Sequence, residues 1–294
     1  VPDPDADQHP EHRHMEEQVA ALLEEALLGR DRPDPVLALA HLGAEPAAAQ
    51  IGREAFRHLG RRTRWDKGDW LPVVSSSHER EAAHRAFPKR AEDWDVARIV
   101  EDYADAAERM MAAGMDGIEL EAYGHLMDQF WSPATNDLDA PYGGSLENRM
   151  RFGLEVLAAI RERCGSRFIV GVRYAGDEAM GGGLTREDGL AISQRLKDSG
   201  LVDFLNVVRG HIDTDAGLTD VIPVQGMRSA PHLGWAGEVR AATGLPTFHA
   251  ARIPDVATAL ALRGAQILVI PSAVPFGYEH LLRLRTRARA QDNQ

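Results

Sequence analysis

Short apolar runs alternate with longer amphipathic segments over most of this chain, from residue 93 to residue 270. In chain order the segments and runs lie at 96–111, 117–120, 145–160, 168–173, a segment that starts at 185, 204–208, 235–242, 246–249, 256–262 and 267–270. Such alternation predicts parallel strands joined by helices. It restricts the chain to the α/β class with a largely parallel sheet.

The chain before residue 93 has weaker signals. An apolar stripe at helical spacing predicts a helix over 19–27, and the run VLALAHL at 36–42 predicts a short buried strand. The segment 58–90 is rich in Arg, Trp, Pro and Ser without a clean period, so it is predicted to be a long loop that serves a site. Residues 1–14 are polar and are predicted to be a disordered tail, followed by a single domain over 15–290.

A parallel sheet of this kind either closes into a (β/α)8 barrel or spreads as a doubly wound sheet. No G-x-G-x-x-G follows any predicted strand, which disfavours the dinucleotide-binding form of the doubly wound sheet. Polar residues gather instead where predicted strands end, which is where barrels place their active sites. These residues are Glu121, Tyr123, His125, Arg173, Tyr174, Arg209, His211, Asp213, His249 and Arg252. The prediction is a TIM barrel, incomplete or irregular at its first and last strands.

Composition narrows the class of partner. The 294 residues carry a net charge of −12, and an acidic surface repels phosphate backbones and anionic lipid. We therefore expect a small-molecule substrate, with neither nucleic acid nor a membrane as partner. One cysteine, Cys164, excludes a multi-cysteine metal or iron–sulfur site, and the spacing of His9, His12 and His14 suits no metal site. No export signal or long apolar run is evident, so the expected location is the cytoplasm.

The stretch DGIELEAYGHLMDQFWSPATNDLDAPYGGSLENRMRF, Asp116 to Phe152, resembles the signature of the old yellow enzyme family, the FMN-dependent barrel oxidoreductases that include trimethylamine dehydrogenase. HLGRRT at 58–63, GVRYAGDE at 171–178 and GLPTFHAARIPD at 244–255 match in the family's order, so the resemblance covers roughly residues 56–258. The form EAYGHLMDQFWSP resembles the branch that oxidatively demethylates N-methylated amino acids and amines. The resemblance implies FMN as cofactor and NAD(P)H as a candidate electron partner. A homo-oligomer and a complex with an electron-transfer partner are both compatible with this resemblance.

The resemblance also implies which residues bind the flavin. Arg173 stands where the family has an arginine at a strand end, and a positive donor there stabilises the charge that reduced flavin gathers near N1 and O2. An ordinary salt bridge at the rim is the alternative. His58 belongs to a motif that lies beside the flavin in the family, where it either contacts the flavin or supports the loop. Ala251 and Arg252, after the predicted seventh strand, are the expected phosphate contacts.

Tyr123 and His125 are the implied catalytic residues. Aligned on DQF at 128–130, His125 takes the place of the family's proton-donating tyrosine and Tyr123 that of one carbonyl ligand. Glu121 replaces the other carbonyl ligand, so the pair that clamps a carbonyl is absent. A tyrosine and a histidine suit proton steering in amine oxidation, where the N-methyl carbon gives a hydride to the flavin and the iminium product hydrolyses to formaldehyde. An NAD(P)H-dependent ene-reductase and a purely structural hydrogen-bond network are the alternatives.

Four residues are candidates for contacting the substrate. Trp65 and Tyr174 are expected at the mouth of the barrel, where an aromatic face attracts a methylated ammonium. The carboxylates of Glu121 and Asp213 are suited to hold a cationic nitrogen. Core packing of the aromatic rings and solvation of the two carboxylates are the plain alternatives.

Some positions depart from the family's pattern. Ala55 stands where the family has a glutamine that binds the flavin pyrimidine, and Pro271 and Ser272 stand where a Gly-Arg step binds the FMN phosphate. These departures support an alternative of another class: a truncated, catalytically inactive barrel with impaired FMN binding.

Overall fold

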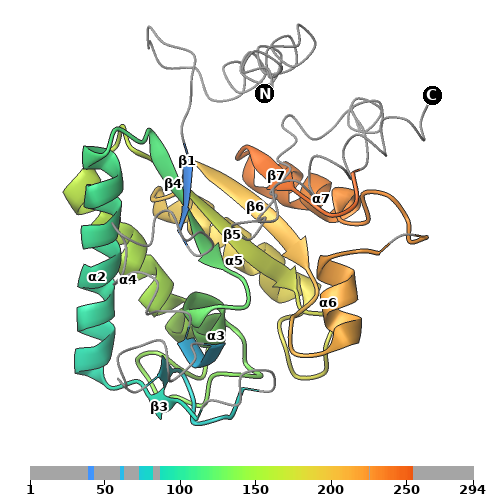
Figure 1. The fold of residues 1–294 in the computed structure, drawn as a ribbon, viewed down its shortest axis with the longest axis horizontal. Coiled ribbons are helices and arrows are strands. Elements are labelled where there is room, and N and C mark those ends of the chain that lie inside the picture. The colour runs from blue at the N-terminus through green and yellow to red at the C-terminus, as the bar shows by residue number, and fades with distance from the viewer. Residues whose placement is uncertain (1–38, 43–59, 63–72, 82–86, 225, 254–294) are drawn as a thin grey trace, which may run out of the picture.

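The computed structural model describes residues 39–42, 60–62, 73–81, 87–224 and 226–253, and for 39–42 only the course of the backbone. Strands and helices alternate along the chain, as the sequence predicts (Figure 1). In chain order the elements are β1 (Leu39–Leu42), the 3-10 turn η3 (Gly60–Arg62), β2 (Val74–Ser75), β3 (Lys89–Arg90), α2 (Asp93–Ala112), β4 (Gly117–Ala122), α3 (Leu126–Trp131), α4 (Leu146–Cys164), β5 (Ile169–Asp177), α5 (Arg186–Ser199), β6 (Phe204–Arg209), α6 (Asp215–Val221), α7 (Leu233–Thr243) and β7 (Thr247–His249).

Five strands form one parallel sheet in the order β1-β4-β5-β6-β7. The strand predicted in the run 36–42 is present over Leu39–Leu42, and it pairs with β4. α2 and α4 pack against each other beside β4, α5 packs on β5, and α7 packs on β6 and β7. The carboxyl ends of all five strands therefore lie at one edge of the sheet, where α3 and α6 follow β4 and β6 (Figure 1).

Successive side chains of a strand point to opposite faces, and here the two faces differ in chemistry. The face toward the helices is apolar and fully buried. Its side chains are Ile118, Leu120 and Ala122 from β4, Val170, Val172 and Tyr174 from β5, and Leu205 and Val207 from β6. The other face carries polar groups, and Asn206 Nδ2 donates to Glu119 Oε2 at 2.9 Å across it. The same alternation places Glu121 and Arg173 on this polar face.

Ser145 and the pair Thr185 and Asp188 have the residue types that cap helix starts, and in the structure both cap a helix. Ser145 Oγ accepts a hydrogen bond from Asn148 N at the start of α4. Thr185 and Asp188 bond reciprocally at the start of α5, each side chain accepting from the other residue's backbone N–H. Such bonds satisfy backbone donors that the first turn of a helix leaves open.

Replacing Ser145 with alanine is expected to lower the free energy of unfolding by about 1 kcal/mol, because the first turn of α4 loses the acceptor for Asn148 N. Urea unfolding followed by circular dichroism measures the change. Ser229→Ala, at an exposed position outside the helices, is the control and should change stability by less than about 0.5 kcal/mol. Equal values for the two variants would contradict the capping role.

The structure contains two helices that the sequence did not predict, α3 and α6. All six side chains of α3 are buried, and a segment as short as LMDQFW does not cover enough turns for its period to predict a helix. The predicted long loop 58–90 contains, in its described part, only η3 and the two-residue strands β2 and β3.

Several predicted features lie outside the described residues: the tail 1–14, the helix 19–27, the helix 256–262 and the strand 267–270. The predicted single domain over 15–290 stays a prediction.

Candidate active site

Arg173 on β5 and Glu121 on β4 face each other on the polar side of the sheet. The two residues are paired in register, and Arg173 Nε lies 3.8 Å from Glu121 Oε1, an ion pair too long for a hydrogen bond. Both side chains are largely buried, at 14% and 5% exposure. Arg173 Nε makes no hydrogen bond with any described residue. The predicted strand ends at Arg173, whereas β5 continues to Asp177. A largely buried, charged Nε donor without an acceptor is the group that an anionic or carbonyl ligand would satisfy.

Tyr123 extends the same face beyond the end of β4. The guanidinium carbon of Arg173 lies 5.2 Å from the centroid of the Tyr123 ring, within the range of a cation–π contact. Burial raises the pKa of the Tyr123 phenol to about 12, against the opposing effect of the Arg173 charge. The phenol therefore keeps its proton at neutral pH and acts as a hydrogen-bond donor.

Tyr123 and His125 flank Gly124 in the turn between β4 and α3. His125 Nδ1 lies 2.8 Å from the carbonyl oxygen of Tyr123. A carbonyl only accepts, so Nδ1 carries the hydrogen in this bond and Nε2 of the neutral ring carries the lone pair. The turn thus pairs a proton donor, the Tyr123 phenol, with a nitrogen that is able to accept a proton.

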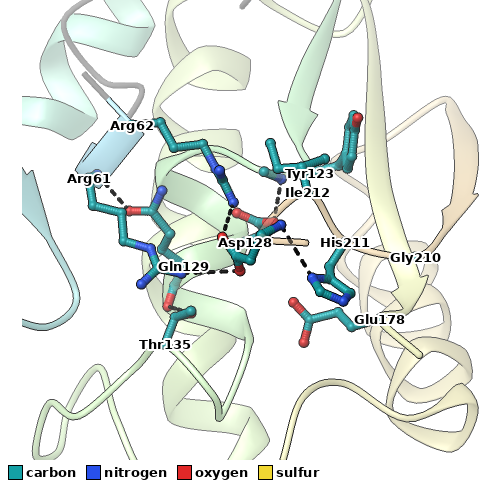
Figure 2. Close-up of a pocket in the computed structure, with 12 residues that line it drawn as sticks. Arg61, Arg62, Tyr123, Asp128, Gln129, Thr135, Glu178, Gly210, His211 and Ile212 are labelled. Carbon is teal, nitrogen blue, oxygen red and sulfur yellow. Dashed lines mark hydrogen bonds and ion pairs between the residues drawn. The ribbon is translucent and has the colours of Figure 1, made fainter. Parts of the chain in front are cut away.

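A small pocket lies beside this turn, and Figure 2 shows Asp128 in it between Arg62 on one side and His211 and Glu178 on the other. Its lining comes from η3, the β4–α3 turn, α3 and the loops after β5 and β6. The lining residues are Arg61, Arg62, Tyr123, Gly124, Asp128, Gln129, Thr135, Glu178, Gly210, His211, Ile212 and Asp213. Positively and negatively charged side chains therefore line this pocket together with Tyr123.

Asp213, after β6, binds two arginines of η3. Its Oδ1 lies 2.6 Å from Arg62 Nη2, and its Oδ2 lies 3.3 Å from Arg61 Nη2. Arg62 also binds the fully buried Glu81 at 2.9 Å. The prediction that Asp213 holds a cationic nitrogen of the substrate is not what this geometry favours, because two guanidinium groups already neutralise the carboxylate.

Two further carboxyl groups of the pocket are buried. Asp128 and Glu178 are 8% and 5% exposed. Burial raises the pKa of Asp128 to about 7, with a further increase from the charge of Glu178 and an opposing effect of Arg62. Burial also raises the pKa of Glu178, whose Oε2 accepts hydrogen bonds from Ser132 Oγ and Leu184 N, each at 2.6 Å.

Tyr174 needs a correction, because it does not line the site. It follows Arg173 on β5, so its side chain points to the helix side of the sheet, where it is 0% exposed. Its hydroxyl bonds Ser193 Oγ on α5, and its ring packs 6.3 Å from that of Trp131. The plain alternative, packing in the core, is the one that the structure supports.

The remaining predicted residues fall into two groups. His58 and Trp65 lie outside the described residues, as does Ala55. Ala251 and Arg252 follow β7 with positive φ angles of 82° and 47°. Arg252 Nε donates to Met227 O at 2.6 Å, which ties this loop to the segment before α7. The structure thus brings together Glu121, Tyr123, His125 and Arg173, and it places Ala251 and Arg252 two strands away from β5.

Sequence reasoning did not assign roles to Arg62, Asp128, Gln129 and Glu178. Gln129 Oε1 accepts from Arg61 N at 3.0 Å and from Ser75 Oγ at 2.9 Å, so it holds η3 and β2 against α3. Gly60 allows this approach, since a Cβ there would lie 2.1 Å from Gln129 Oε1. A charged residue amid the apolar letters of LMDQFW was the available signal for Asp128.

Within the described ranges, no helix has the length and apolar content needed to cross a membrane. Among the same residues, no group of three or more His, Cys, Asp or Glu side chains is arranged to hold a metal ion.

Two curated proteins are similar to this chain over about two thirds of its length. A "Probable N-methylproline demethylase" from Rhizobium meliloti is 72% identical over 202 residues, which make up 69% of this chain and 30% of that protein. An "N,N-dimethylglycine/sarcosine dehydrogenase" from Chromohalobacter salexigens is 44% identical over 199 residues, 67% of this chain and 29% of that protein. The matched region thus spans about 30% of the length of each relative.

The fold is that of an old yellow enzyme. The structure of the old yellow enzyme homologue from Zymomonas mobilis matches with a TM-score of 0.58 at 20% identity, over 72% of this chain and 60% of that one. The predicted TIM-barrel class is confirmed, and the five strands of the larger sheet form part of the barrel wall. Residues 49–219, more than half of the chain, match the family model described as NADH:flavin oxidoreductase / NADH oxidase. The chain therefore belongs to the NADH:flavin oxidoreductase / NADH oxidase family.

Proposed function

We propose that this chain is the flavin-binding barrel of an FMN-dependent oxidoreductase that demethylates N-methylated amino acids. The observation that carries the proposal is the pair formed by Arg173, within β5, and Tyr123, directly after β4: a largely buried arginine without an acceptor on Nε lies beside a protonated tyrosine. The names of the two relatives, which act on N-methylproline and on dimethylglycine or sarcosine, support the substrate class.

The described residues fit a flavin. Arg173 offers a buried, charged donor to the N1/O2 edge of the ring system, and Glu121 keeps the guanidinium on the polar face of the sheet. Ala251 and Arg252 are the proposed phosphate contacts, and their positive φ angles turn the backbone sharply after β7. His58 is proposed beside the flavin and Trp65 beside the substrate, both on the strength of their motifs alone.

The chemistry divides between cofactor and chain. FMN, when bound, accepts the hydride that leaves the N-methyl carbon. The amine must first lose its N–H proton, because the nitrogen lone pair forms the new C=N bond, and His125 Nε2 is proposed to take that proton. The Tyr123 phenol donates a hydrogen bond that orients the substrate. The Glu121 carboxylate attracts the positively charged nitrogen of the substrate. Water then adds to the iminium carbon, releasing formaldehyde and the demethylated amine.

The visible spectrum of the purified chain after reconstitution and desalting tests the cofactor. We expect a retained flavin spectrum that bleaches anaerobically with N-methylproline or dimethylglycine and releases one formaldehyde per flavin reduced. Loss of all flavin on desalting would favour the inactive-barrel alternative. Bleaching by NAD(P)H with turnover of an enone, and none by the amines, would favour the ene-reductase instead. The electron acceptor and any homo-oligomer or protein partner stay predictions.

His125→Gln is expected to slow flavin reduction by the amine by about 100-fold, because the glutamine side chain has no basic nitrogen. Flavin retention should be unchanged. Stopped-flow absorbance at saturating substrate measures the rate. Tyr123→Phe should mainly raise the half-saturating substrate concentration, with Tyr142→Phe as the control for a tyrosine that bonds Glu155 away from the site. An unchanged rate in His125→Gln would remove His125 from the mechanism.

A further inference from the structure

Asp128 is the acidic side chain of a short helix that is buried throughout. It is the third residue of α3, and every side chain of that helix is buried. Its Oδ2 accepts a hydrogen bond from Gly124 N, in the turn before the helix. Its Oδ1 is buried and has no hydrogen-bond partner among the described residues, although the residue lines the pocket. Burying a carboxyl group in this way costs free energy, so the position calls for an explanation.

The turn that Asp128 holds carries both proposed catalytic residues. Gly124 separates Tyr123 from His125 and has a φ of +70°, in the left-handed region. A Cβ at Gly124 would lie 2.5 Å from Cδ1 of Ile212, so the loop after β6 limits the turn from the other side. The Gly124 N–H is the backbone donor at the centre of this turn, and the Asp128 carboxyl is its acceptor.

Charged and titratable groups surround Asp128 on every side. Tyr103 comes from α2, Tyr123 from the end of β4, Glu178 from the loop after β5, Arg61 and Arg62 from η3, and His211 and Asp213 from the loop after β6. Burial and the charges of Glu178 and Asp213 raise the pKa of Asp128 to about 7, while Arg62 and the Gly124 N–H act in the opposite direction. The charge of Asp128 in turn raises the pKa of Tyr123.

We propose that Asp128 is a positioning residue that fixes the Tyr123–His125 turn through Gly124 N and places its charge in the same pocket as the Tyr123 phenol. The part that concerns catalysis rests on the proposed function. The part that concerns the turn and Tyr123 does not, since it follows from contacts within the chain.

Two variants separate the two effects. Asp128→Asn keeps an acceptor for Gly124 N and removes the charge. Asp128→Ala removes both. Asp139→Asn is the matched control, because the Asp139 side chain is 97% exposed and its ion pair with Arg90, at 3.8 Å, is a long one. Thermal unfolding of each variant shows first whether it folds.

The main readout is the 13Cζ chemical shift of Tyr123 between pH 5 and 9, measured in the full chain. The chain has five tyrosines, and Tyr123→Phe identifies the signal. We expect an inflection near pH 7 in the wild type and in Asp139→Asn, and none in Asp128→Asn. An inflection that persists in Asp128→Asn would belong to another group and would overturn the electrostatic part of the proposal.

Stability against pH gives a second readout that needs no flavin. The folded pKa of Asp128 is raised above its unfolded value of 3.8, so the folded state binds a proton that the unfolded state has lost between about pH 4 and 7. As the pH rises from about 4 to 7, the free energy of unfolding of the wild type should therefore fall relative to that of Asp128→Asn. Above pH 7 the difference between the two chains should stay constant. A constant difference between the two chains across the whole range would contradict the raised pKa.

The positioning effect is measured by amide exchange and by flavin reduction. In Asp128→Ala the Gly124 amide should exchange faster with solvent, and the saturating rate of reduction by the amine should fall on the order of 10- to 100-fold. Asp128→Asn should keep the slow exchange and, at pH 6, most of the rate. If wild type is not reduced by any amine, the proposed function fails, whereas the Gly124 exchange and the Tyr123 shift still decide the positioning role. Unchanged Gly124 exchange in a folded Asp128→Ala would overturn it.

Discussion

Replacing Arg173 with methionine is expected to reduce the affinity of the chain for FMN by about 100-fold. Methionine has a similar length but no charge and no donor. The lost interaction is a charge-assisted hydrogen bond in a largely buried setting, worth about 3 kcal/mol. The substitution also removes the cation that lies 3.8 Å from Glu121 Oε1. Titration of the apoprotein with FMN, followed by flavin fluorescence, measures the change.

Controls separate the donor from the charge. Arg173→Lys retains the charge without the fork of donors and should recover only part of the affinity. Glu121→Gln tests the partner: if Glu121 holds the guanidinium in place, the double variant Glu121→Gln with Arg173→Met should bind FMN no worse than Arg173→Met alone. An Arg173→Met chain that binds FMN as the wild type does would return Arg173 to the alternative of an ordinary salt bridge.

Asp213→Ala is expected to lower the free energy of unfolding by about 3 kcal/mol. Arg61 and Arg62 have side chains that are only 5% and 10% exposed, and the substitution removes a carboxylate that binds both. Each arginine keeps one other carboxylate, Glu79 for Arg61 and Glu81 for Arg62, but removing a partner of a buried charge is strongly destabilising. Chemical unfolding followed by tryptophan fluorescence measures the loss.

The matched control is Asp215→Ala, two residues later at an exposed position in the first turn of α6. It should cost about 1 kcal/mol or less. Arg62→Met, combined with Asp213→Ala in a double-mutant cycle, isolates the pair, and we expect the two losses not to add. Additive losses would show that the two side chains act independently.

The strands could be predicted because buried parallel strands read as short apolar runs, and β4, β5 and β6 all do. The starts of α4 and α5 could be predicted from Ser145 and Thr185, because an N-cap bonds only residues a few positions away in the chain. The sequence predicted that the strand ends at Arg173, but β5 continues to Asp177, so Arg173 lies within the strand, where the structure places it beside Tyr123.

Other features depend on contacts that no short window of sequence contains. Tyr174 was expected at the mouth, although its neighbour Arg173 already faced the polar side, and adjacent residues of a strand face opposite ways. Asp128 is recognisable as a buried acid only once Glu178, Asp213 and Arg62 surround it, and these come from three distant segments. The pocket is a product of tertiary structure, which local patterns do not encode.

The ion pair between Arg62 and Asp213 also bears on the order of folding. It joins residues 151 positions apart, and Arg61 and Asp213 are 152 apart. Closing so long a stretch of chain carries an entropic cost that is recovered only after β4, β5 and β6 have paired through nearer contacts. The pocket beside Tyr123 should therefore assemble in a late step, and the Arg62–Asp213 contact should be weak in the folding transition state. Asp213→Ala would then speed unfolding while leaving the folding rate almost unchanged.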